Sequence, residues 1–295
     1  MIIIKVMGGL GNQMFQYAIY RRLKEEGQNV KLDLGWTKIY KHPYLIPDVF
    51  NVTGDIASYK DARQLGAKSK YRFRRILDYR LGLNKINKKN KNIVNDNNVY
   101  VYQNDIETVL KSNEDVYLEG FWQNELWFKG AEDIIREEFT FKRTLDNKGL
   151  EILSKLTAPN SIALHYRHYT GENLSTWQRP IEYYYKAVEY FQEEKGNAVF
   201  YIFSDNIEWC KKNFNISAAV FIDSAGIKHE ERDMRLISHC PNCIISNSTY
   251  SWWGAYLNPE KHKKTVISPR VWLNEYSESN PNLSDWITLD VPNVI

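Results

Sequence analysis

Residues 2–34 read IIIKVMGGLGNQMFQYAIYRRLKEEGQNVKLDL, and their pattern indicates the fold class. A short apolar run at 2–6 leads into three glycines within positions 8–11. Apolar residues then recur at helical spacing over 12–26, which predicts a helix. Alternation at 29–34 predicts a second strand. Strand, helix and strand in this order are typical of a βαβ unit with parallel strands.

The rest of the chain repeats this alternation of short apolar strands and helices. Strands are predicted at 98–103, 115–120, 161–167, 198–203, 219–223, 243–246 and 265–268, and helices at 129–139, 180–195, 230–238 and 251–258. The pattern predicts an α/β fold with two Rossmann-like domains, each built on a parallel sheet. We expect these domains to cover residues 1–150 and 151–295.

Composition bounds the function. The 295 residues, 43% of them hydrophobic, suffice for two cores. The net charge of +3 argues against a dedicated nucleic-acid partner. The N-terminal apolar run is too short for a signal peptide or a membrane span, so a cytoplasmic protein is expected. Ten Lys or Arg at 68–91 form either a solvated surface or a surface for an anionic acceptor or the inner membrane.

Three cysteines do not make a disulfide framework. Cys240 and Cys243 form a lone CxxC pair, which cannot complete a four-ligand zinc site. A role in the core is favoured over redox chemistry.

The glycine loop admits two interpretations. A dinucleotide loop needs a third glycine at position 14, which is Met14, although Asp33 stands where a ribose-binding acid is expected. Asn12 and Gln13 begin the helix, where they either cap it or donate hydrogen bonds to phosphate or sugar oxygens.

Two loops of the second half follow predicted strands, where ligands bind in parallel sheets. Asn247, Ser248 and Thr249 precede a helix, and they serve as caps or as a phosphate site. Arg167 follows another strand, and its guanidinium can pair bidentately with a phosphate. Glu172 is the nearest carboxylate, and it is either a general base or a surface charge.

Four segments together resemble the α-1,2-fucosyltransferase family, glycosyltransferase family 11. They are GGLGNQMFQYA at 8–18, HYR at 165–167, FSDN at 203–206 and IISNSTYSWWGAYL at 244–257. The resemblance implies a GT-B fold whose domains face one another across a cleft. It also implies GDP-fucose as the donor, inversion at the sugar carbon and no required metal. The first domain would serve the acceptor side and the second would bind GDP-fucose.

The resemblance also assigns roles to residues. Arg167 would stabilise the leaving β-phosphate, and Asn12 would lie near the diphosphate and fucose. The resemblance does not assign the general base: Glu172 is expected because it is the carboxylate closest to the Arg167 motif, and Glu119, Glu125 and Asp205 are the alternatives. The expected donor-binding residues are Gly9, Gly11, Gln13, His165, His168, Ser204, Asp205, Asn206, Asn247, Ser248, Thr249 and Ser251. Trp122 and Gln123 are expected to contact the acceptor, a galactose-terminated oligosaccharide or glycolipid of a pathway such as bacterial O-antigen synthesis.

The chain departs from the family pattern His-x-Arg-Arg-x-Asp. His168 replaces the second arginine and Thr170 replaces the aspartate, so fewer hydrogen bonds are available there. The sequence contains no Asp-x-Asp, the motif with which GT-A enzymes commonly hold a metal. Cations and helix dipoles would then have to neutralise the departing GDP.

Three rival functions remain open. The first is a transferase that uses another nucleotide sugar. The second is an NAD-dependent oxidoreductase built on Gly9, Gly11 and Asp33. The third is a non-catalytic protein in which tryptophans 122, 252 and 253 stack on sugars.

Overall fold

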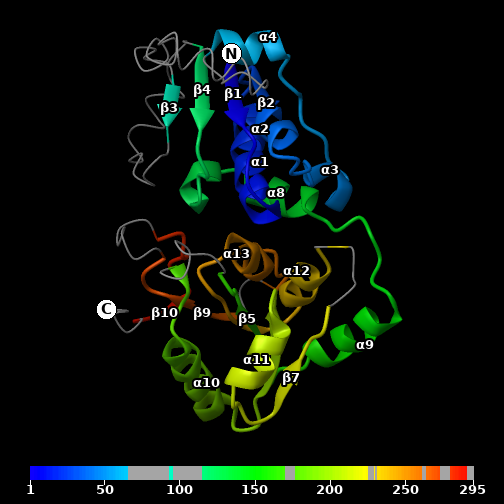
Figure 1. Cartoon of the computed structure of the whole chain (residues 1–295), viewed down its shortest axis with the longest axis vertical. Coiled ribbons are helices and arrows are strands. Elements are labelled where there is room, and N and C mark those ends of the chain that lie inside the picture. Colours follow the sequence, from blue (N-terminus) through cyan, green and yellow to red (C-terminus); the bar gives the residue numbers. More distant parts are fainter. Residues whose placement is uncertain are drawn as a thin grey trace. The chain divides into compact units, whose positions relative to one another are not determined.

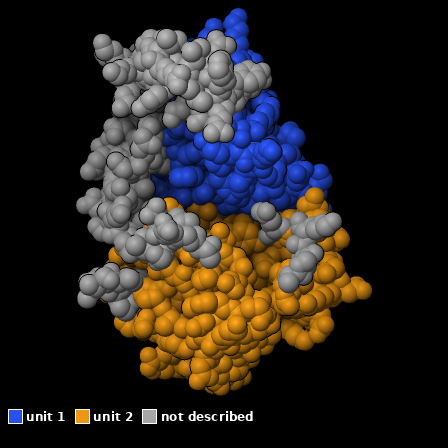
Figure 2. Space-filling view, in the orientation of Figure 1, with its two compact units in different colours: residues 1–142 blue, residues 143–295 orange. Residues whose placement is uncertain are grey.

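The computed structural model describes residues 1–65, 93–95, 115–169, 177–224, 229, 231–260, 264–272 and 280–290. The chain divides into two compact units, residues 1–142 and 143–295 (Figure 2). The first helix of the second unit, α9 (Asn147–Leu156), spans position 150, at which the sequence prediction divides the chain.

The first unit is built on a four-stranded sheet. Its order is β2 (Val30–Asp33), β1 (Ile2–Lys5), β4 (Val116–Glu119) and β3 (Ile93–Asn95). All neighbouring strands are parallel, as the βαβ pattern predicts. β1 lies between β2 and β4, which explains why its three isoleucines are buried. The loops after β1 and β4 therefore leave the same edge of the sheet from adjacent strands.

Helices follow these strands. α1 (Leu10–Glu25) begins two residues earlier than predicted, inside the glycine loop. The remaining helices of this unit are α2 (Gly35–Ile39), α3 (Ile46–Val49), α4 (Tyr59–Gln64), the 3₁₀ turn η1 (Glu125–Phe128) and α8 (Glu132–Glu138) (Figure 1).

The second unit has a six-stranded parallel sheet. Its order is β7 (Ala219–Phe221), β6 (Val199–Ser204), β5 (Ser161–Tyr166), β8 (Asn242–Ile244), β9 (Thr265–Pro269) and β10 (Ile287–Leu289). By position in the unit this order is 3-2-1-4-5-6, the Rossmann arrangement. The order reverses between β5 and β8, and ligands bind at such a switch point.

Helices cover the second sheet on both faces. They are α9, α10 (Ile181–Lys195), α11 (Ile207–Asn213), α12 (Glu231–Ser238) and α13 (Thr249–Tyr256) (Figure 1). The side chains of Ile162, Leu164 and Tyr166 on β5 join a core with α10 and α11. His165 points to the opposite face and meets Tyr250 of α13. This alternation follows from the two-residue period of a strand.

The predicted α/β class with parallel sheets in two units is confirmed. Strand β10 and helix α9 were not predicted. The predicted strand at 98–103 and the basic stretch at 68–91 lie outside the described residues. Cys240 and Cys243 are buried, and burial raises the pKa of both thiols, which agrees with the core interpretation. Among the described residues, no helix is long and apolar enough to cross a membrane.

Candidate functional site

The switch point of the second sheet brings two of the predicted loops together. His165, near the end of β5, places its Nδ1 atom 3.1 Å from the Ser246 hydroxyl beyond β8. Its ring centroid lies 5.7 Å from that of Tyr250. Burial lowers the pKa of His165 to about 3, and the neighbouring Arg167 adds to this effect. A neutral imidazole therefore forms part of the wall between the two loops.

Arg167 is the first exposed residue after β5. Its Nη1 atom lies 3.0 Å from Oδ2 of Asp205, and 45% of its side chain is accessible. The other carboxylate oxygen of Asp205 accepts a hydrogen bond from the backbone N–H of His168 at 2.8 Å. Asp205 thus orients the guanidinium and leaves part of it open to an anion.

The side-chain amide of Asn206 contacts the ring of His168. Oδ1 of Asn206 accepts from the backbone N–H of Trp209, so its Nδ2 is the atom that lies 2.9 Å from Nδ1 of His168. An amide nitrogen donates, so this contact is a hydrogen bond from Asn206 to the His168 ring. The His168 ring also stacks on Trp209 at 5.5 Å. His168 and Asn206 therefore contact the start of α11, not the loop after β8.

Ser204 supports the same turn, because its hydroxyl accepts a hydrogen bond from the Asn206 N–H at 3.0 Å. Together, Ser204, Asn206 and His168 support the turn that carries Asp205. Their predicted contacts with the donor stay predictions.

The loop after β8 leads into the first turn of α13. Ser248 is the N-cap residue but its side chain makes no capping hydrogen bond. The Ser251 hydroxyl is fully buried and donates to the Ser248 carbonyl at 3.1 Å, so it supports the loop from inside. Uncapped N–H groups at a helix start carry partial positive charge and suit an anion. Thr249 is the first residue of this helix.

Asn247 is 3% exposed, and its Nδ2 atom donates to the carbonyl of Trp177 at 2.8 Å. Its Oδ1 atom is buried and has no hydrogen-bond partner among the described residues. An acceptor at this position suits a hydroxyl group of a ligand. Glu172 and Thr170 lie outside the described residues, so the general base stays a prediction.

In the first unit, the glycine loop is shaped by one glycine. Gly8 has φ of +80°, and a Cβ atom there would lie 2.6 Å from Nδ2 of Asn12. At Gly9, no atom lies within 4 Å of the position that a Cβ atom would take, and φ has an ordinary negative value. Oδ1 of Asn12 accepts from Nε2 of Gln123 at 2.9 Å. The amide nitrogen of Asn12 is left as the donor at this loop.

Two buried glutamines hold the loop in place. Gln13 donates to the carbonyls of Gly8 and Pro43 at 2.9 Å each, and it accepts from the Leu45 N–H at 2.8 Å. Its side chain is 0% exposed and supports the loop, and its contact with the donor stays a prediction. Gln16, which the sequence did not single out, accepts from the Met7 N–H and donates to the Gly120 carbonyl.

Residues 120–123 follow β4 and lie beside the glycine loop, which follows the neighbouring strand β1. Trp122 is 1% exposed and packs edge-on against Trp127, and its contact with the acceptor stays a prediction. Phe121, at 40% exposure, is the accessible ring of this segment. Gln123 is tied to Asn12, as described above.

Two rival functions lose their structural basis. Asp33 accepts hydrogen bonds from Gly35 N–H and the Tyr117 hydroxyl, both at 2.8 Å, so its carboxylate is occupied within the chain and does not await a ribose. Trp252 and Trp253 are both 0% exposed, and they cannot stack on a sugar in this conformation.

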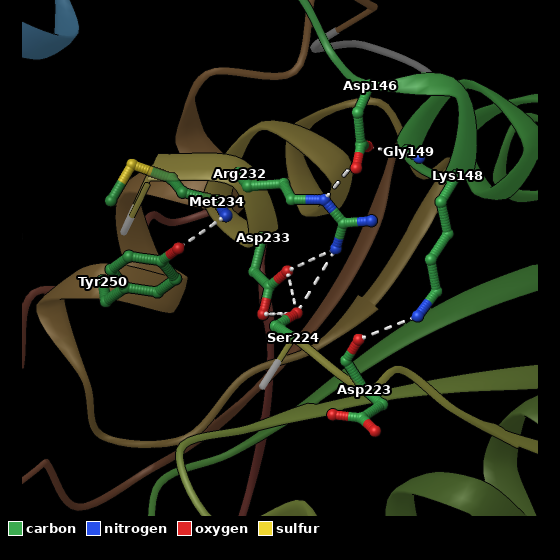
Figure 3. Close-up of polar contacts among 9 residues, drawn as sticks. All are labelled: Asp146, Lys148, Gly149, Asp223, Ser224, Arg232, Asp233, Met234 and Tyr250. Atoms are coloured by element: carbon green, nitrogen blue, oxygen red, sulfur yellow. Dashed lines mark hydrogen bonds and ion pairs between the residues drawn. The ribbon is translucent and has the colours of Figure 1, made fainter. Parts of the chain in front are cut away.

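A polar cluster around the buried side chain of Arg232, which the sequence did not reveal, lies at the start of α12 (Figure 3). The Ser224 hydroxyl lies 2.7 and 2.9 Å from the two oxygens of Asp233, and burial raises the pKa of this carboxyl. Arg232 lies between Asp233 and Asp146. The next residue, Met234, donates its N–H to the Tyr250 hydroxyl at 2.8 Å. These contacts connect α9 and α12 with α13, the helix whose Tyr250 packs against His165.

The described residues contain no group of three or more His, Cys, Asp or Glu placed to hold a metal ion.

Comparison with known proteins gives a consistent set of relatives. A sequence model of glycosyl transferase family 11 matches residues 1–290. The α-1,2-colitosyltransferase of Escherichia coli is 31% identical over 306 residues, which covers 98% of this chain and 99% of the relative. The O-antigen biosynthesis glycosyltransferase WbnK of Escherichia coli is 29% identical and covers 96% and 98%. Galactoside α-(1,2)-fucosyltransferase 1 of Sus scrofa is 26% identical over 154 residues, 48% of this chain and 42% of the relative.

Proposed function

The chain belongs to glycosyl transferase family 11, and from this premise we propose that it transfers L-fucose from GDP-β-L-fucose to the 2-hydroxyl of a galactoside. The names of the relatives support the linkage, since two of them are an α-1,2-colitosyltransferase and a galactoside α-(1,2)-fucosyltransferase. The observation that carries the proposal is the placement of Arg167 beside the loop that opens α13, at the switch point of the second sheet.

The chemistry of the leaving group explains why Arg167 and the start of α13 are both needed. When the bond from fucose C1 to the β-phosphate oxygen breaks, negative charge collects on GDP. A guanidinium and the N–H groups of a helix start stabilise such charge where it develops. Arg167 supplies the first and the turn at Ser248 and Thr249 supplies the second. The reaction then requires no metal ion, and no other cofactor takes part.

In this proposal the acceptor binds to the first unit, while the candidate for the general base belongs to the second. The acceptor 2-oxygen attacks C1 from the face opposite the phosphate, so the configuration inverts. Its proton passes to a carboxylate, for which Glu172 is the candidate. The Nδ2 group of Asn12 donates a hydrogen bond near the transferred sugar, and Phe121 and Gln123 border the acceptor.

The acceptor proposed is a galactose-terminated oligosaccharide or glycolipid. One relative is named for O-antigen biosynthesis, which supports a bacterial surface glycan. The corresponding place of action is the cytoplasm, where nucleotide sugars serve as donors.

A second donor has specific support. Because the 31% identical relative is named a colitosyltransferase, GDP-colitose is the alternative nucleotide sugar. Colitose is the 3-deoxy counterpart of L-fucose, so a single hydroxyl separates the two donors. A direct comparison of the two donors at equal concentration decides between them.

Thermal unfolding with GDP, UDP and NAD, each in EDTA, tests nucleotide recognition without knowledge of the acceptor. A ligand at about 100 times its Kd adds about 2.7 kcal/mol. For a domain of roughly 150 residues this corresponds to a rise in Tm of about 5–10 °C. We expect this rise with GDP alone, and a smaller rise for Arg167→Ala. A rise with NAD or UDP and none with GDP would refute the proposal.

A further inference from the structure

Tyr169 joins the two halves of the proposed leaving-group site. It follows β5 by three residues, and its ring lies below the guanidinium of Arg167, with 5.7 Å between Cζ and the ring centroid. Its hydroxyl donates to the backbone carbonyl of Asn247, in the loop before α13, at 2.9 Å. One side chain therefore contacts both the cation and the phosphate-binding loop.

The guanidinium is held from two directions. Asp205 binds its Nη1 atom at 3.0 Å, and the face of the Tyr169 ring lies on another side. A cation over an aromatic face gains electrostatic stabilisation from the ring quadrupole. Ordering a long arginine side chain costs rotamer entropy, and this cost opposes a single fixed conformation. The contact with the Tyr169 ring adds to the ion pair with Asp205 in offsetting that cost.

The hydrogen bond from the Tyr169 hydroxyl to Asn247 does not depend on pH in the physiological range. Burial raises the pKa of Tyr169 to about 12, so the phenol keeps its proton and donates throughout the physiological pH range. The ring is held in turn by Trp177, whose ring meets it edge-on at 6.0 Å.

Asn247 is fixed from a second side. Its side-chain Nδ2 donates to the carbonyl of Trp177, and the buried guanidinium of Arg179 donates to the same carbonyl through Nε and Nη2 at 3.3 and 3.1 Å. Asn247, whose carbonyl receives the Tyr169 hydroxyl, is thus also held by a hydrogen bond of its own side chain. Because Asn247 is held in place, its hydrogen bond with the Tyr169 hydroxyl can fix the position of the tyrosine ring.

We propose that Tyr169 is a positioning residue that sets Arg167 at a fixed distance from the loop at 247–249. Its ring supports the guanidinium and its hydroxyl ties that support to the phosphate-binding loop. The inference rests on the proposed function, because Arg167 must be the group that meets the diphosphate.

A double-mutant cycle on the full chain tests the role. GDP affinity is measured by calorimetry in EDTA for the wild type, Arg167→Ala, Tyr169→Leu and the double variant. Loss of the ring contact is expected to weaken GDP binding by about 2- to 30-fold. In the Arg167→Ala background the same change is expected to alter the Kd by less than about twofold, since coupled residues are non-additive.

Two further variants sharpen the result. Tyr169→Phe keeps the ring and loses only the hydroxyl contact, so its Kd is expected between those of the wild type and Tyr169→Leu. Tyr185→Phe is the matched control, because the Tyr185 hydroxyl bonds the backbone at residues 213 and 215 at an exposed site. Its GDP affinity is expected to equal that of the wild type. If Tyr169→Leu does not fold, the cycle is completed with Tyr169→Phe.

The outcomes separate the two proposals. If the wild type binds GDP and Tyr169→Leu weakens binding equally with and without Arg167, the positioning role is wrong while the proposed function stands. The same conclusion follows if Tyr169→Leu binds as the wild type does. If the wild type does not bind GDP, the proposed function itself fails, and the positioning role fails with it.

Discussion

At the scale of single residues, burial decides which of the polar side chains can meet a ligand. Arg167 is exposed, whereas Gln13 and Ser251 are fully buried and hydrogen-bonded to the backbone. The sequence shows that all three follow a predicted strand, because strand ends can be recognised from apolar runs. It does not show which way each side chain turns, since that depends on contacts with distant residues such as Pro43.

His165 gives a prediction at this scale. Its pKa is about 3 in the folded protein, against about 6.5 in an unfolded chain. Between these values the unfolded state binds a proton that the native state does not, so stability is present above pH 6.5 and falls as the pH drops. His165→Asn should reduce the slope of unfolding free energy against pH, between pH 6.5 and 5, by up to about 1.4 kcal/mol per unit. Urea unfolding of the wild type and of His165→Asn at several pH values measures this slope.

The control for this experiment is His229→Gln, at an exposed position. It should leave the slope as in the wild type. Equal slopes for the wild type and His165→Asn would show that burial of this imidazole does not control the acid sensitivity.

At the scale of elements, the alternation of strands and helices was sufficient to predict most of the second sheet. β5, β6, β8 and β9 were expected within about two residues of where they lie. The short β10 has only three partly buried residues, which give no clear pattern. Strand order could not be predicted, because periodicity describes one strand and order depends on pairings between distant strands.

The junction of β1 and α1 gives a prediction for the glycine loop. Gly8→Ala should lower the unfolding free energy by roughly 1–3 kcal/mol, because φ of +80° strains any other residue and the new methyl group would meet Asn12. The matched control is Gly9→Ala, where space is open, and its cost should stay below about 1 kcal/mol. Chemical denaturation of both variants checks the difference. Equal costs would mean that the conformation of Gly8 is not required.

At the scale of the whole molecule, two units with parallel sheets each place polar loops at the carboxyl end of adjacent strands. In the second unit these loops carry Arg167 and the start of α13, which suit an anion. In the first unit they carry the Asn12–Gln123 pair and the exposed Phe121. The family resemblance implies that the second unit binds the donor and the first serves the acceptor, and this division stays a prediction.

A transfer assay in EDTA tests the proposed fucosyl transfer most directly. The wild type is incubated with GDP-β-L-fucose and a β-galactoside, and GDP release and the linkage of the product are measured by NMR. We predict GDP release that depends on the acceptor, an α-1,2-linked fucosyl galactoside, and a rate about a hundredfold lower for Arg167→Ala. Fucose on another hydroxyl, or an intact GDP-fucose pool while another nucleotide sugar is consumed with the same acceptor, would contradict the account.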